Sequence, residues 1–313
     1  MHQEKIGLAL IAPAGCAPEG ADIERGLAVL TARGFTVHNY YDHAARYLRF
    51  GANDAERVAQ MHAAAQNPEV DVVMALRGSY GLSRILHLLD YELLANSGKI
   101  FVGYSDLTAL SLALLAQTGA ASYTGPMLCD DFTREDTSDF TLDNFLACLH
   151  GPQHVLKIEH AQTLHGQIAE EGMLWGGNLA MINSLMGTRF MPQIEKGILF
   201  VEDVSEHPYR VERMLLQLLH AGVLQQQRAL ILGDFSNYRL SPYDNGYDFA
   251  SMLAFLRSQL SIPVLLGLPY GHIRQRATLV IGAHAQLQAD ATDFCLTMRA
   301  YPYLQTNTFT FTS

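Results

Sequence analysis

The chain has 313 residues, of which 49% are hydrophobic and 17% are charged, and its formal net charge is -10. This length exceeds the size at which one hydrophobic core usually stops growing, so we expect a globular protein with two domains. The negative charge disfavours a nucleic-acid backbone or an anionic membrane surface as a partner, and we expect neither.

The N-terminus and the cysteines indicate a cytoplasmic protein. No stretch reaches the roughly 18 uncharged apolar residues that a membrane span requires. The start, MHQEKIGLALIAPAG, fits a first β-strand better than a signal peptide, because it lacks a basic beginning and a clean cleavage site. The four cysteines, which show neither CxxC pairing nor metal-ligand spacing and which we expect to be reduced, are Cys16, Cys129, Cys148 and Cys295.

The first half alternates strand patterns with helix patterns. Strands are predicted at 6–11, 35–40, 70–76 and 99–102, and helices at 21–33, 53–66 and 83–95. The β-branched, apolar run at 70–76 is typical of a strand buried on both faces. This alternation predicts a parallel sheet covered by helices on both faces, a three-layer α/β/α domain. Functional groups in such sheets collect at the carboxyl ends of the strands.

The segment KIFVGYSDLTALSLALLAQTG, at 99–119, places a serine where a strand turns into a helix. Its strand ends at Gly103 and the chain passes through Ser105 and Asp106 directly into an apolar helix. The hydroxyl of Ser105 would then lie beside free helix N–H groups, as a nucleophile requires. The sequence is not G-x-S-x-G, and a serine at this position also serves as a helix N-cap.

A polar and acidic stretch separates the two halves of the chain. We interpret residues 130–170 as the connection, with an N-terminal domain at 1–150, a linker at 151–170 and a C-terminal domain at 171–313. In the smaller, β-rich α/β second domain, strands are predicted at 198–201, 228–232 and 264–268, and helices at 209–221 and 247–259. The last 40 of the 313 residues are predicted to be β-structure.

Three turns that follow strands carry candidate chemistry, namely those of Ser105, Glu202 and His272. An imidazole must take the proton of a nucleophilic serine, and a carboxylate must orient and stabilise that imidazole. Glu202 and His272 would supply these roles if the second domain packs over the sheet end of the first. A carboxylate after a strand also caps helices, and a histidine in a turn also lies on surfaces. The competing side chains are Asp106, Asp203 and Glu206 for the carboxylate and His207 for the base.

Six segments resemble, in order and spacing, the LD-carboxypeptidases, the muramoyltetrapeptide carboxypeptidase family of serine peptidases. These segments are RGSYGLSRIL, KIFVGYSDLTAL, YTGPML, LWGGNLAMINSLMGT, LFVEDVSEHPYRVERMLLQLLHAGVL and GLPYGH. The resemblance implies a cytoplasmic, homodimeric enzyme that removes the terminal D-alanine from murein tetrapeptide in cell-wall recycling, without a metal or cofactor. It implies a triad of Ser105, Glu202 and His272 between the domains, and an oxyanion hole of the backbone N–H groups of Asp106 and Gly78.

The glycine-rich turn departs from the family pattern at one position. The family turn usually reads RGGYG, whereas this chain has Ser79 at the second glycine. A positive φ there would strain a serine by roughly 1 kcal/mol or more. A position that needs only a small residue with a free N–H would accept serine.

The free carboxylate of such a substrate calls for a cation near the serine. Arg77, Arg210 and Arg213 are candidates by motif position, although the last two share a predicted helix with Glu212 and pair with it equally well. Trp175 is expected either to line the cleft or to pack in the core or at the domain joint.

Two other functions stay open from the sequence. A related serine peptidase that cleaves peptidyl or aminoacyl nucleotides, as in microcin C immunity, would need an aromatic platform and an anion site. The acidic segment 130–141 and the net charge of -10 indicate no such anion site. A non-catalytic protein whose two lobes close on a ligand is the alternative from another class. The triad candidates and the missing signal peptide argue against it.

Overall fold

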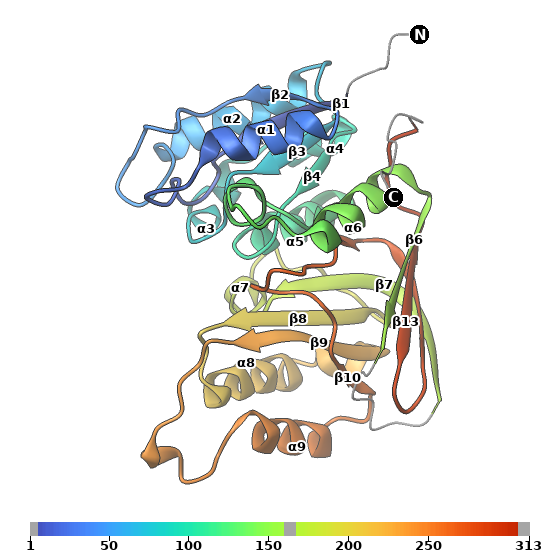
Figure 1. Ribbon diagram of the computed structural model, residues 1–313. Helices are drawn as coiled ribbons and strands as arrows, with labels where there is room; N and C mark the ends of the chain where they lie inside the picture. Colours follow the sequence, from blue (N-terminus) through green and yellow to red (C-terminus); the bar gives the residue numbers. More distant parts are fainter. Residues whose placement is uncertain (1–5, 160–166, 306–313) are drawn as a thin grey trace.

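The computed structural model describes residues 6–159 and 167–305, which form two sheets with their covering helices. One sheet has six strands and the other seven, and they lie one above the other in Figure 1. The architecture is the predicted α/β class with two sheet-based units. In the part of the chain that the structure covers, no helix combines the length and apolarity needed to cross a membrane.

The first sheet carries the predicted parallel strands. Its order is β11-β5-β4-β3-β1-β2, and only β11 runs antiparallel. The strands are β1 (Ile6–Ile11), β2 (Phe35–Asn39), β3 (Val72–Ala75), β4 (Ile100–Val102), β5 (Ser122–Thr124) and β11 (Leu279–Ile281). The buried run in β3 confirms the prediction of a strand covered on both faces.

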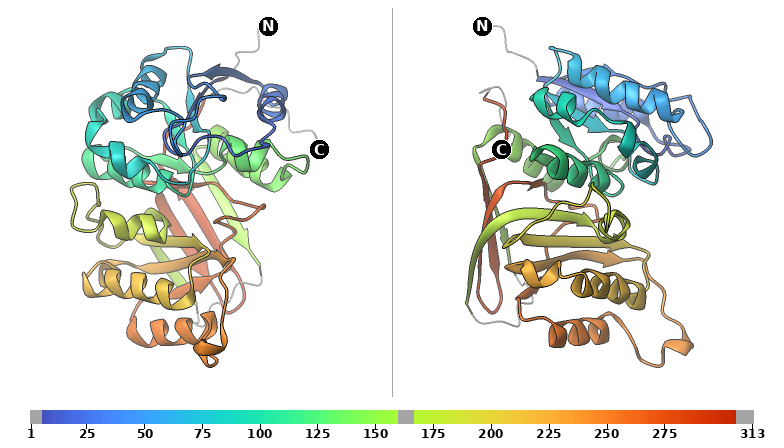
Figure 2. Two further views of the ribbon diagram at one scale, coloured as in Figure 1. Left: turned by 90° about the vertical axis from the view of Figure 1, so that its left-hand side faces the viewer. Right: turned by 180° about the vertical axis from the view of Figure 1, so that it is seen from behind.

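Helices cover both faces of this sheet (Figures 1 and 2). One face holds α1 (Ile23–Ala32) and α6 (Asp139–His150), and the other holds α2 (Asp54–Gln66), α4 (Tyr91–Asn96) and α5 (Leu107–Thr118). Helix α5 is buried continuously from Leu107 to Leu115, because elements of both sheets contact it. An apolar helix without a polar face therefore lies between the two units and carries Ser105 at its start.

The second sheet combines a parallel and an antiparallel half in the order β10-β9-β8-β7-β12-β13-β6. The parallel strands are β7 (Ile168–Asn178), β8 (Ile198–Val204), β9 (Ala229–Ser236) and β10 (Val264–Leu266). The antiparallel strands are β12 (His284–Ala289), β13 (Phe294–Arg299) and β6 (Gln153–Ile158). Helices α8 (Pro208–His220) and α9 (Phe249–Gln259) lie on the side away from the first unit, and α7 (Leu179–Leu185) lies toward it (Figure 1).

The helix predicted at 83–95 is interrupted. It is divided into α3 (Leu82–Ile85), the short helix η1 (Leu86–Leu88) and α4. Asp90 adopts an extended backbone and its side chain accepts the N–H of Leu93, so α4 begins afresh with its own cap. The cap at Asp90 therefore starts a separate helix, although the apolar pattern is continuous.

The stretch interpreted as a connection contains regular structure. Helix α6 lies within 130–150, and the short π-helix η2 (Leu128–Phe132) overlaps the start of that stretch. Strand β6 forms the edge strand of the second sheet within 151–170. Residues 160–166 of that predicted linker lie outside the described residues. In addition, β11 crosses from the second half of the chain into the first sheet. We therefore propose the division at 1–150 and 171–313 with this one exchanged strand.

We predict that a fragment of residues 1–150 does not fold by itself, because it lacks β11 and exposes the edge of β5 and the apolar surface of α5. The full chain should lose its near-ultraviolet circular dichroism in one cooperative transition. The fragment should lack such a transition, and fusing residues 277–283 to it through a flexible linker should restore part of it. Cooperative unfolding of the unfused fragment would contradict the prediction.

Candidate active site

Ser105 lies in the short turn between β4 and α5, in a strained backbone conformation. Its φ is 61°, in the left-handed region, which costs a non-glycine residue on the order of 1–3 kcal/mol. Gly103 has a φ of 158° and packs closely against Leu107. A residue with a Cβ would not fit here, because that atom would lie 2.8 Å from Cγ of Leu107. Strain of this kind aims a side chain out of a strand-to-helix corner, as in the nucleophile turns of hydrolases.

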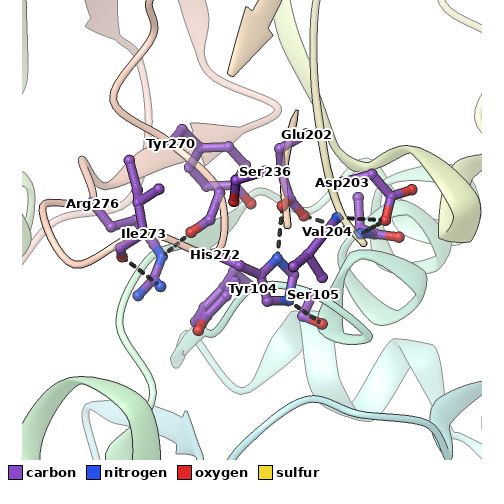
Figure 3. A network of polar contacts seen from close by, with 12 residues as sticks. Tyr104, Ser105, Glu202, Asp203, Val204, Ser236, Tyr270, His272, Ile273 and Arg276 are labelled. Atoms are coloured by element: carbon purple, nitrogen blue, oxygen red, sulfur yellow. Dashed lines mark hydrogen bonds and ion pairs between the residues drawn. The ribbon is translucent and has the colours of Figure 1, made fainter. Parts of the chain in front are cut away.

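The structure brings Ser105, His272 and Glu202 together (Figure 3). Nε2 of His272 lies 3.1 Å from Oγ of Ser105, and Nδ1 of His272 lies 2.8 Å from Oε2 of Glu202. Ser105 comes from the first unit, Glu202 from the end of β8, and His272 from the segment after β10. The carboxylate, the imidazole and the hydroxyl are hydrogen-bonded in series, and such a series can take a proton from the hydroxyl. We call Ser105, His272 and Glu202 the relay.

The electrostatics of the site favour a charged imidazole. Burial works to lower the pKa of His272, but the hydrogen bond and the negative charge of Glu202 outweigh it, and the pKa is raised above its ordinary value. The Glu202 side chain is 0% exposed, so little water screens this pair. Glu202 therefore favours the protonated form of His272.

Asn178, which no sequence pattern singled out, bridges two neighbouring carboxylates. Its Nδ2 donates to Oε1 of Glu202 at 3.1 Å and to Oδ1 of Asp203 at 3.0 Å. Asp203 also accepts the N–H of Ala180 at the start of α7. Burial first, and then the charge of Glu202, raise the pKa of Asp203 to about 6. Asp203 thus faces α7, and only Glu202 contacts His272.

A buried ion pair anchors the segment that carries His272. The Arg276 guanidinium donates to the carbonyls of Gly271 at 2.6 Å and Ile273 at 3.0 Å, one on each side of His272 (Figure 3). Its Nη1 lies 2.5 Å from Oδ1 of Asp131, and both side chains are at most 5% exposed. Asp131 belongs to η2 in the first half of the chain, so the pair joins the two units at the site.

An aromatic ring completes this anchor. The Arg276 guanidinium carbon lies 3.5 Å from the centre of the Tyr104 ring, and that ring meets His272 edge-on with centres 5.1 Å apart. Tyr104 immediately precedes Ser105 in the chain. The packing of Arg276, Tyr104 and His272 therefore positions both the Ser105 hydroxyl and the His272 imidazole. Nothing in the local sequence distinguishes Arg276 from other arginines, because the carboxylate and the ring that hold its guanidinium, those of Asp131 and Tyr104, lie far away in the chain.

The expected oxyanion donors lie beside the hydroxyl. A Cβ added to Gly78 would lie 2.8 Å from Cβ and 2.9 Å from Oγ of Ser105, and 3.3 Å from the backbone nitrogen of Asp106. Within the described chain, neither the Gly78 nor the Asp106 N–H donates to another protein group. The Asp106 carboxylate accepts the N–H of Leu82 at 2.9 Å, and burial raises its pKa to about 6. This carboxylate links the Ser105 turn to the start of α3, and the Asp106 backbone N–H has no acceptor among the described residues.

The position of Ser79 has a positive φ, the strained alternative considered from the sequence. Its φ is 80°, a conformation that favours glycine. The Ser79 hydroxyl accepts a hydrogen bond from Nη2 of Arg49 at 3.0 Å. The strain therefore comes with a contact that glycine could not make.

The competing side chains have other partners. Glu206 pairs with Arg210 at 2.5 Å, and His207 caps α8 and lies 3.1 Å from Asp244. Arg210 therefore pairs on its helix with Glu206 and not with Glu212. Among the described groups of three or more His, Cys, Asp and Glu side chains, none is arranged to hold a metal ion.

The arginine and tryptophan candidates have different environments. Arg77 is partly buried beside the Gly78 turn, with Nη1 3.4 Å from the carbonyl of Cys16. Arg213 lies in a shallow surface depression of α8, away from the contacts of the relay. The prediction that Trp175 lines the cleft is wrong, because its side chain is 0% exposed and its Nε1 donates to Gln227 at 2.8 Å. It packs in the core of the second unit.

The matches to known families cover both units. The model of the LD-carboxypeptidase N-terminal domain matches residues 8–125, and that of the LD-carboxypeptidase C-terminal domain matches residues 171–287. The chain belongs to the LD-carboxypeptidase family, which confirms the resemblance seen in the sequence.

Individual relatives agree with this assignment. A putative carboxypeptidase of Streptomyces coelicolor is 33% identical over 294 residues, 90% of each chain. The crystal structure of a muramoyltetrapeptide carboxypeptidase from Oxalobacter formigenes is 50% identical, covering 95% of this chain and 99% of the other with a TM-score of 0.89. A microcin C7 self-immunity protein of Escherichia coli is 27% identical over 275 residues, 77% of this chain and 78% of the other. The protein is thus a hydrolase of the carboxypeptidase type.

We predict that Arg276→Met lowers kcat about 10- to 100-fold with little change in KM, because the His272 segment loses its anchor. The acid limb of the pH profile should also move to higher pH, since the Arg276 charge lowers the pKa of His272. Arg276→Lys should keep the position of that limb while losing rate.

The matched control is Arg274→Met, an exposed neighbour that pairs with Asp136. It should change kcat little. Comparing thermal unfolding of all three variants separates misfolding from misplacement. An unchanged kcat, or an acid limb that moves to lower pH in Arg276→Met, would show that the anchor does not position His272.

Proposed function

We propose that this protein is a serine LD-carboxypeptidase that removes the terminal D-alanine from murein tetrapeptide in the cytoplasm during cell-wall recycling. The observation that carries the proposal is the hydrogen-bonded series from Ser105 through His272 to Glu202, with distances of 3.1 Å and 2.8 Å. The 50% identity to a muramoyltetrapeptide carboxypeptidase supports the substrate class. The homodimer expected from the family resemblance belongs to the same proposal.

The first half of the reaction forms an acyl-enzyme. Neutral His272 accepts the proton of Ser105 through Nε2 as Oγ attacks the carbonyl carbon of the bond to D-alanine. The N–H groups of Gly78 and Asp106 hold the negative oxygen that develops. Glu202 stabilises the imidazolium through Nδ1.

The second half releases both products. The imidazolium of His272 protonates the amine of the leaving D-alanine, the C–N bond breaks, and the peptide stays on Ser105 as an ester. Water then enters, and its oxygen attacks the ester carbonyl carbon as His272 removes its proton. The bond to Ser105 Oγ breaks, the imidazolium returns the proton to Oγ, and the tripeptide leaves. The pKa of His272 sets when the base is neutral, so activity should fall on the acid side.

The two alternatives have less support. The microcin self-immunity relative is 27% identical, against 50% for the muramoyltetrapeptide carboxypeptidase. Membership of a carboxypeptidase family and the assembled relay disfavour a non-catalytic binding protein. Assaying murein tetrapeptide beside a peptidyl adenylate separates the two enzymatic functions, and binding without turnover of either would indicate the third.

We predict that Ser105→Ala keeps the fold and lowers kcat by about three or more orders of magnitude, because the attacking oxygen is gone. Release of D-alanine from murein tetrapeptide measures the effect, and thermal unfolding reports the fold. Ser111→Ala, in the same helix but outside the relay, should retain wild-type turnover. If Ser105→Ala keeps more than about a tenth of the activity, Ser105 is not the nucleophile.

We predict that Glu202→Gln lowers kcat on the order of 10³- to 10⁴-fold, because the imidazolium loses its counter-charge. The raised pKa of His272 depends on Glu202, so the remaining activity should persist to lower pH than in the wild type. Asp203→Asn should cost far less, because Asp203 contacts α7 and not His272. If the two variants come out in the reverse order, the carboxylate assignment is wrong.

A further inference from the structure

Three arginines gather at the turn that touches the Ser105 hydroxyl. Arg49 donates to Ser79 Oγ at 3.0 Å, and Arg77 and Arg46 both reach the Cys16 segment. In the described structure, none of the three arginines has a carboxylate within ion-pair distance. We call Arg46, Arg49 and Arg77 the arginine cluster.

The neighbouring arginines provide a contrast. Arg57 and Arg84 lie close by and both pair with Asp54, at 2.6 Å and 2.9 Å. One carboxylate thus pairs with both guanidinium groups and offsets one of their two positive charges. The arginine cluster has no such carboxylate partner among the described residues, so it is a local concentration of positive charge in a chain whose formal net charge is -10.

The cluster lies next to the oxyanion donors. Gly15 packs closely against the Gly78 turn, and its N–H donates to the Gly78 carbonyl at 3.0 Å. A Cβ added to Gly15 would lie 3.0 Å from Cβ of Ser79 and 3.4 Å from Cδ of Arg77. Gly78 in turn touches Ser105. The loop between β2 and α2 that carries Arg49 lies on the same side of the first sheet as α3 (Figures 1 and 2). Carboxyl ends of parallel strands meet at such an edge and form ligand sites.

The strain at Ser79 points to the same site. With a φ of 80°, serine costs more than glycine at this position, so the side chain must contribute something to offset that cost. The contribution visible in the structure is the hydrogen bond from Arg49 to the Ser79 hydroxyl. The guanidinium carbon of Arg49 also lies 5.8 Å from the centre of the Tyr80 ring, so the hydroxyl and the ring together position this exposed group one residue away from Gly78.

We propose that Arg49, held by the Ser79 hydroxyl, and Arg77 bind a carboxylate of the peptide substrate beside Ser105. The inference rests on the proposed carboxypeptidase function and adds the residues that recognise the negative end of the substrate. A guanidinium forms paired, charge-assisted hydrogen bonds to a carboxylate, which fixes the peptide relative to the hydroxyl. The carboxylate of the leaving D-alanine and a second carboxylate elsewhere in the peptide are the two sources of this group.

The experiment measures kcat/KM of the full chain with three murein tetrapeptides. One is unmodified, one has a carboxamide at the terminal D-alanine, and one has a carboxamide in place of the side-chain carboxylate of its third residue. The variants are Arg49→Met, Arg77→Met, Ser79→Ala and Ser79→Gly. The control is Arg299→Met, an exposed arginine on β13 that bonds to Gln153.

In the wild type, the amide that removes the recognised carboxylate should lower kcat/KM about 10- to 100-fold, the range of charge-assisted hydrogen bonds. Arg49→Met and Arg77→Met should each remove most of that discrimination, and the control should keep it. The peptide whose discrimination disappears identifies which carboxylate is bound.

The two Ser79 variants separate recognition from strain. Both lose the hydroxyl and should lose discrimination equally, whereas only Ser79→Gly relieves the positive φ and should unfold at the higher temperature of the two. Unchanged discrimination in both would overturn the role of the hydroxyl. Unchanged discrimination in Arg49→Met and Arg77→Met, with an active wild type, would overturn the carboxylate site alone. No cleavage of any peptide by the wild type would overturn the proposed function and the site with it.

Discussion

The hydrogen bond between Glu202 and His272 is the interaction on which the site depends. Glu202 is fully buried at the end of β8, where an unpaired carboxylate would be very costly. Its two oxygens are satisfied by His272 and by Asn178, and these contacts fix the imidazole with its other nitrogen toward Ser105. One buried charge thereby determines how the second unit presents its base to the first.

The joint between the units keeps that alignment. Strand β11 completes the first sheet, and the ion pair of Arg276 with Asp131 holds the His272 segment against η2. Because both partners are buried, losing either one would leave an uncompensated charge. Relative movement of the two units is therefore opposed where the hydroxyl and the imidazole must stay within hydrogen-bond distance.

The two turns beside the Ser105 hydroxyl are both strained. Ser105 and Ser79 both have positive φ values, 61° and 80°, and both lie at carboxyl ends of parallel strands. Such conformations persist only where surrounding contacts fix them. The Asp106 carboxylate, which accepts the Leu82 N–H, and the buried helix α5 provide those contacts.

The sequence does not predict β5, β6 or β7, and it assigns the residues of β6 to a linker. From apolar periodicity and turn residues, which are local properties, it predicts β1 to β4, β8 to β10 and most of the helices, and its motifs identify the family. It also placed Ser105, Glu202 and His272 at strand ends, but their meeting required the packing of two units. Only the tertiary structure decided that Trp175 is buried, that Arg210 pairs with Glu206, and that β11 joins the first sheet. The positions of Asn178 and Arg276 were likewise invisible, since Asn178 bonds to Glu202 and Arg276 is held by Asp131, both distant in the chain. The type of a residue and its local pattern limit the chemical roles open to its side chain. Contacts with residues distant in the chain, which only the folded protein makes, select one of those roles.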